Sequence, residues 1–189
     1  MSLALVGQAV GMFAVTNVDD LVVLAVFFGR TPVGRRRRVV AGQYLGFAGI
    51  LAVSVVGALG AGLLPARLVP FLGLVPIALG LKAAWQAWRD RDEGDEERPG
   101  GAPGVWSVAA VTFANGGDNV GVYVPVFAVA GPGAMAAYAA VFLLGVAVWC
   151  AAGWFLATRP PVARTLARWG HVVLPVVLIG IGVVILAGG

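Results

Sequence analysis

Three carboxylates stand inside long apolar runs of this chain, each beside amides, hydroxyls or glycines. Together the two polar groups comprise Thr16, Asn17, Asp19, Asp20, Asn115, Asp118 and Asn119. A carboxylate at bilayer depth costs roughly 2.5 to 3.5 kcal/mol even on the more lenient insertion scales, so three of them require a functional reason. The usual reason is a path for a cation or a proton.

These side chains offer carboxylate, amide and hydroxyl oxygens, a set that suits divalent cations. The Gly116-Gly117 step could in addition open backbone carbonyls. Three ionised carboxylates would over-neutralise a divalent ion, so we expect at least one to keep a proton that a bound cation expels. Because adjacent helical residues point about 100° apart, Asp19 and Asp20 face one point only if the helix breaks there. In a regular helix one would be a ligand and the other a relay group.

A polar cluster that merely joins helices is the alternative interpretation of each motif. For Asn17, Gln43 or Asn115 alone it is as well supported as function, since amides often bond across membrane helices. For the aspartates it is weaker, because joining helices does not require ionisable groups at this cost. Lys82 either extends to the interface or balances an empty site. Thr16, Gln43 and Lys82 are therefore accessory candidates.

The composition indicates an integral membrane protein. Of 189 residues, 60% are hydrophobic and 12% charged, with a mean hydropathy of +0.92, far from the globular class. Six apolar segments can each span about 30 Å of hydrocarbon; they are 3–29, 39–63, 68–88, 105–130, 134–157 and 171–187. The first is long enough to be tilted, or unwound between Thr16 and Asp20. Gly42 and Gly46 have the GxxxG spacing of close helix pairs, a weak signal among 28 glycines.

Basic residues are distributed to one side of the predicted membrane. Twelve of the 13 flank the first, third and fifth connections, and only Arg67 lies in the second. The odd-numbered connections are therefore expected in the cytoplasm and both termini outside. Since these residues flank apolar spans, nucleic-acid binding is not expected. The single cysteine, Cys150, excludes an intramolecular disulfide.

An acidic linker at 90–104 divides the chain into two similar halves, 1–89 and 105–189. A shift of 99 residues places Asp19 on Asp118, Asp20 on Asn119, Phe28 on Phe127 and Pro76 on Pro175. Three spans per half is an odd number, so the halves must enter the membrane from opposite faces. The sequence thus predicts an all-α membrane protein of six transmembrane helices, built as two inverted three-helix repeats with a midplane site between them. The linker itself is interpreted as a solvated cytoplasmic hinge.

At these residues the chain resembles the cadmium resistance transporters of the CadD type, within the lysine exporter superfamily. The resemblance is carried by TNVDDLVVLAVFF at 16–28, GQYLGF at 42–47, GLVPIALGLK at 73–82 and, most specifically, TFANGGDNVGVYVPVF at 112–127. It implies an exporter of divalent heavy metals, chiefly cadmium, in a bacterial inner membrane. The family's acidic motifs then fall on Asp19, Asp20, Asp118 and Asn119, with Asn17 and Asn115 beside them.

The chain lacks a GxxxxGK[ST] phosphate loop, so ATP drive would need a partner protein, and we expect secondary active efflux driven by protons. We expect neither a cofactor nor enzymatic activity. An oxygen-rich site also suits manganese, zinc or calcium. An amino-acid exporter is a rival, with Lys82 as the anion partner. An intramembrane aspartyl protease is a remote one, because Asn115 replaces the first glycine of its Gly-x-Gly-Asp motif. A homodimer that completes the pathway is compatible with only six spans.

Overall fold

The computed structural model describes residues 2–61 and 103–159 continuously, with separate residues between 63 and 85 and between 176 and 187. Its named elements are α1 (Leu3–Thr16), α2 (Val18–Gly29), the short 3-10 helix η1 (Val33–Arg35), α3 (Arg36–Ala61), α5 (Val105–Asn115) and α6 (Gly117–Ala157). No strand occurs among the described residues, which confirms the all-α class. Lys82, most of the linker and most of the spans 68–88 and 171–187 lie outside them, so six spans and two repeats stay predictions.

The predicted span 3–29 consists of two helices, α1 and α2, bent by 58°. The break falls at Asn17, whose backbone leaves the helical region at φ −118° and ψ 18°. Thr16 Oγ1 donates to Met12 O and Asn17 Nδ2 donates to Phe13 O, both at 2.9 Å. Side chains that bond to the preceding turn in this way compete with helix continuation. The structure therefore shows a helix interrupted just before Asp19, as expected if it unwinds locally.

A second break separates α5 from α6 at Gly116, with φ −82° and ψ 16°. It follows the break at Asn17 by 99 residues, the shift that aligns Asp19 with Asp118. Each following helix carries acid in its first turn: Asp19 and Asp20 in α2, and Asp118 in α6. A carboxylate there is stabilised by the N-terminal end of the helix dipole. The sequence similarity thus has a structural counterpart at both acidic motifs.

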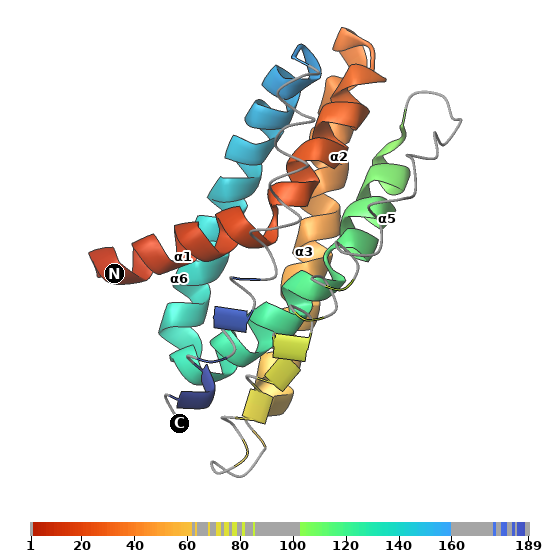
Figure 1. Ribbon diagram of the computed structural model, residues 1–189. Coiled ribbons are helices and arrows are strands. Elements are labelled where there is room, and N and C mark those ends of the chain that lie inside the picture. The colour runs from red at the N-terminus through yellow and green to blue at the C-terminus, as the bar shows by residue number, and fades with distance from the viewer. Residues whose placement is uncertain are drawn as a thin grey trace.

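Helix α6 is two helices joined at Gly131. Its 41 residues would form a straight rod of about 60 Å, twice the hydrocarbon thickness. Gly131 has φ 77° and ψ 166°, a conformation that glycine adopts without a Cβ penalty, and Pro132 follows it. Figure 1 shows the chain reversing near this point, so that the second part of α6 returns beside α2. The predicted loop 131–133 is reduced to this single non-helical residue.

Helix α3 packs closely against α5 through glycines. A Cβ on Gly42 would lie 2.6 Å from Val105 O, and one on Gly46 would lie 2.6 Å from Ala109 O and 2.7 Å from Thr112 Cβ. Only glycine permits this approach of the two backbones. The GxxxG spacing therefore marks a real helix contact, and it brings Gln43 of α3 against the C-terminal half of α5.

A cluster of aromatic rings fills the centre of the bundle below the first break. Phe47, Tyr123 and Phe142 are fully buried, and neighbouring ring centroids in the cluster lie 4.7 to 6.4 Å apart. Phe13 of α1 packs edge-on against Phe47 at 5.6 Å. This packing holds α1, α3 and both parts of α6 together around the polar residues.

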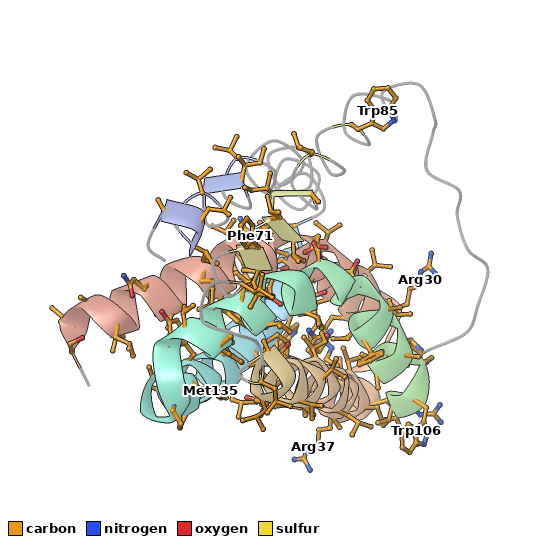
Figure 2. All side chains as sticks on the ribbon, turned by 90° about the horizontal axis from the view of Figure 1, so that it is seen from below. Arg30, Arg37, Phe71, Trp85, Trp106 and Met135 are labelled. Atoms are coloured by element: carbon orange, nitrogen blue, oxygen red, sulfur yellow. The ribbon has the colours of Figure 1, made fainter. Side chains whose placement is uncertain are left out.

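The described arginines gather at one end of the bundle, where α2 and α6 end and α3 begins (Figure 1). Arg37 points outward there, and Trp106 points outward from α5 (Figure 2). Arg36 lies over the ring of Trp154, 5.1 Å from its centroid. The described arginines of the first and fifth predicted connections thus share one end, as the one-sided charge requires, while the cytoplasmic assignment stays a prediction; they are Arg30, Arg35 to Arg38 and Arg159.

Candidate metal site

The amide of Asn115 joins the two aspartates of the first break. Its Nδ2 donates to Asp19 Oδ2 and to Asp20 Oδ1, each at 2.9 Å. The two hydrogens of an NH2 group diverge, so one amide can serve carboxylates on adjacent residues. Asp19 is half-buried and Asp20 is only 4% exposed. Residues almost 100 positions apart in the sequence therefore meet at one point.

The second oxygen of Asp20 is also held by an amide. Gln43 Nε2 donates to Asp20 Oδ2 at 3.0 Å, and Thr112 Oγ1 donates to Gln43 Oε1 at 2.6 Å. Because an ionised carboxylate only accepts hydrogen bonds, the NH2 end of Gln43 faces Asp20 and its oxygen accepts from the threonine hydroxyl. Gln43 thus contacts the acidic group directly. Thr112 was not predicted, although it lies one turn before Asn115 on the same face of α5.

Asp118 and Asn119 approach the same group from the start of α6. Asp118 is half-buried, its Oδ1 accepts the backbone N–H of Asn119 at 3.0 Å, and its charge interacts with those of Asp19 and Asp20. Asn119 is 3% exposed and its Oδ1 has no hydrogen-bond partner among the described residues. A buried oxygen left without a donor costs about 1 to 3 kcal/mol, so it is well suited to accept a cation.

A second polar network surrounds the break itself. Asn119 Nδ2 donates to Asn17 Oδ1 at 3.0 Å, and Asn17 Nδ2 lies 2.9 Å from Tyr123 Oη. Tyr123 Oη also bonds to Thr16 Oγ1 at 2.9 Å, and Trp149 Nε1 donates to the backbone oxygen of Asn17 at 2.6 Å. Tyr123 lies one turn after Asn119 on α6, which the helical spacing could have shown. Nothing in the local sequence distinguishes Trp149.

The carboxylates form a pair with a nearby third member rather than a closed cluster. Among the residues that the structure describes, no three His, Cys, Asp or Glu side chains are grouped so that they could hold a metal ion. Any cation here would need amide oxygens as well as carboxylates. The residues that supply them, Asn115 and Asn119, come from the second half of the sequence, whereas Asp19 and Asp20 come from the first.

A comparison with known families bears on the class of protein. A family model for the cadmium resistance transporter matches residues 13–189. The chain belongs to this family. The match contains both helix breaks and every residue of the polar group, and it confirms the resemblance read from the motifs. Membership of a transporter family supports cadmium resistance transport and agrees with a non-enzymatic role. No curated protein and no solved structure matches the chain.

Proposed function

We propose that this member of the cadmium resistance transporter family is a secondary active exporter of divalent heavy-metal cations, with cadmium as the first candidate. Its ligands would be Asp19, Asp20, Asp118, Asn115 and Asn119. One observation carries the proposal: the positive end of a single amide lies between two inward-facing carboxylates of a broken membrane helix. Broken helices of this kind form the ion sites of many transporters.

The NH2 group of Asn115 marks the position that a cation would take. It is 2.9 Å from one oxygen of each aspartate, whereas metal–oxygen distances for divalent ions are about 2.0 to 2.6 Å. A cation therefore fits after a small inward movement of the carboxylates. The Asn115 amide would have to draw back from that position to admit the cation. A half-turn of the amide would then direct its Oδ1 at the cation, so the residue would change from a hydrogen-bond donor to both aspartates into a ligand.

Asp118 and Asn119 would complete the site from the second break. The buried Oδ1 of Asn119 lacks a donor among the described residues, and Asp118 is electrostatically coupled to both other aspartates. Carboxylates and amide oxygens are hard ligands that also suit manganese and zinc. The alternative cargoes are therefore manganese and zinc.

Proton coupling follows from charge balance at the site. Three neighbouring carboxylates in a medium of low dielectric constant repel one another, so at least one would keep a proton before the cation arrives, and the positive charge of the cation would then favour release of that proton. In the other direction, a protonated carboxylate is lost as a ligand, so cadmium affinity should fall as the pH is lowered. Proton release on adding cadmium to the purified protein measures the coupling. A proton count near zero would contradict it.

Metal retention in cells tests the transport function. Cells that express the chain are loaded with cadmium, manganese, zinc or lysine, and retention is compared between the wild type, Asp118→Asn and the linker variant Asp95→Asn. Asp95→Asn is the matched control, since it makes the same chemical change in the acidic linker of the sequence. We expect the wild type and the control to deplete cadmium and Asp118→Asn to retain it. Depletion of lysine alone would overturn the metal assignment.

We also propose insertion into the bacterial inner membrane with the arginine-rich end of the bundle in the cytoplasm. The shared position of the arginines after α2 and α6 supports this orientation. Reporter fusions after residue 30 and after residue 133 should give opposite locations. The same location for both would refute the assignment.

A further inference from the structure

Asn17 is the most fully bonded residue at the first helix break. It is 1% exposed, and its Oδ1 accepts from Asn119 while its Nδ2 lies 2.9 Å from Phe13 O, Thr16 Oγ1 and Tyr123 Oη. Its backbone N–H donates to Phe13 O, and its backbone oxygen accepts from an indole. Every polar atom of Asn17 thus has a hydrogen-bond partner, whereas Oδ1 of Asn119 has none among the described residues. The residue is therefore built to hold the backbone rather than a metal.

The bonds to Asn17 come from both parts of α6. Tyr123 lies before the reversal at Gly131 and Trp149 lies after it, so two separate helical segments meet the same residue. The directions of the bonds are consistent: Thr16 Oγ1 donates its proton to Met12 O, which leaves Tyr123 to donate to Thr16 and to accept from Asn17. The ring of Trp149 also packs edge-on against Phe13, 5.1 Å between centroids.

We propose that Tyr123 and Trp149 are positioning residues of the acidic site, which act through Asn17 to fix the bend between α1 and α2. The bend determines where Asp19 and Asp20 lie relative to Asn115, because both follow the break within α2. The proposal rests on the function proposed above. It assigns Asn17 to positioning and leaves cation binding to Asp19, Asp20 and the residues of the second break.

Spin-label distances across the bend test the proposal without reference to metal. Labels at Leu3 and Val26, which are 91% and 46% exposed, report on α1 and α2. For a bend of 58°, helical rise places these positions about 30 Å apart. The buried Cys150 is replaced by alanine in every sample. We expect Trp149→Phe and Tyr123→Phe to widen the distance distribution to about twice that of the parent, since the first removes one and the second two of the hydrogen bonds that hold the break.

Two matched variants make the same chemical changes, loss of an indole or of a tyrosine hydroxyl, at positions away from the first helix break. Trp154→Phe removes an indole that is 51% exposed, and Tyr138→Phe removes a hydroxyl whose one described bond, to Gln8, is long at 3.4 Å. Both should leave the distribution as narrow as in the parent. An unchanged distribution in Tyr123→Phe and Trp149→Phe would overturn the proposal. If Trp149→Phe does not fold, Tyr123→Phe decides alone, because it keeps the ring and its packing.

Cadmium binding to the same purified variants separates this inference from the proposed function. We expect Trp149→Phe to weaken binding about tenfold, the equivalent of one lost hydrogen bond, and Tyr123→Phe, which loses two, at least as much, while the two controls bind cadmium like the parent. Equal weakening in positioning and control variants would refute a specific role. If the wild type binds no cadmium and the bend still widens, the proposed cargo fails and the positioning role stands.

Discussion

Two adjacent glycines at the second helix break allow a sharp test of the structure, because only one of them has room for a side chain. A Cβ added to Gly116 would overlap Ile50 Cδ1 and lie 2.7 Å from Ile50 Cγ1, whereas nothing lies within 4 Å of a Cβ added to Gly117. Both glycines have ordinary backbone angles, since Gly131 is the one glycine with a positive φ among the described residues. The two substitutions to alanine thus differ in sterics rather than in strain.

The magnitude follows from the packing of Ile50. Its side chain is fully buried, so it cannot move aside without disturbing the core, and overpacking of this kind costs about 1 to 3 kcal/mol. Gly117→Ala places alanine in the first turn of a helix, where it is favoured over glycine by up to about 1 kcal/mol. We therefore expect Gly116→Ala to destabilise the protein and Gly117→Ala to leave it unchanged or slightly more stable.

Unfolding in mixed detergent micelles measures these free energies, and a double variant identifies the cause. Ile50→Val alone removes Cδ1 and should cost about 0.5 to 1.5 kcal/mol. Combined with Gly116→Ala it removes the overlapping atom, so the two effects should differ from additivity by about 0.5 to 3 kcal/mol in the favourable direction. Equal stability of Gly116→Ala and Gly117→Ala, or strict additivity with Ile50→Val, would show that α3 and the second break are not packed as described.

Three further predictions concern the site, the reversal of α6 and pH. Thr112→Val should lower the free energy of unfolding by about 1 to 3 kcal/mol and weaken cadmium binding, because the buried Gln43 Oε1 loses its donor. The control is Thr158→Val, which removes an exposed hydroxyl. Equal effects of the two substitutions would contradict a role of the Thr112 hydroxyl at the site. Gly131→Ala should lower the free energy of unfolding by about 1 kcal/mol or more, because alanine is strained at a φ of 77°. Gly133→Ala should not lower it, because a Cβ at Gly133 meets open space. Equal midpoints of thermal unfolding in the two variants would refute the strain at Gly131. Cadmium affinity, measured by titration from pH 8 to pH 5, should fall steadily, and an affinity independent of pH would exclude protonation of the ligands.

The helical class and the acidic motifs could be predicted because both depend on composition and short-range pattern. Long apolar runs require helices in lipid, and a carboxylate in such a run is expensive enough to mark function. The alignment of Asp19 with Asp118 indicated a similarity of backbone structure as well as of side chains, since the helix breaks lie at corresponding positions in the two motifs. Gly42 and Gly46 were a weak signal that the structure explains by backbone contact with α5.

The partners within the site could not be predicted, because they depend on how helices rotate against one another. Asn115 serves Asp19 and Asp20 only because α5 and α2 meet at their ends. The oxygen of the Gln43 amide accepts from Thr112, a residue without charge or unusual spacing. Trp149 reaches Asn17 from a helix that returns after Gly131, and such long-range contacts leave no local pattern.

The two breaks differ in how far the hydrogen bonds and helix ends of the described residues offset the cost of burying an ionised carboxylate. An ionised carboxylate at bilayer depth costs about 2.5 to 3.5 kcal/mol, a helix N-terminus returns about 0.3 to 1, and each hydrogen bond to a charge about 1.5 to 3. Asp20 accepts from two amides and lies at a helix start, so part of its cost is offset. Among the hydrogen bonds of the described residues, Asp118 accepts one, from the neighbouring backbone N–H, and the oxygen of Asn119 beside it accepts none.

A transporter must attract its cargo and also release it. Carboxylates that accept hydrogen bonds on all sides would bind a cation weakly, since the cation must displace those bonds. Carboxylates without hydrogen-bond donors would hold the cation too firmly. Asp20 and Asn115 form the part of the site in which hydrogen bonds already stabilise the carboxylates, so that an amide and a cation compete for the same oxygens. Asp118 and Asn119 form the part of the site that a bound cation would stabilise most. The difference between the two breaks, rather than their similarity, is thus what would make binding at this site reversible.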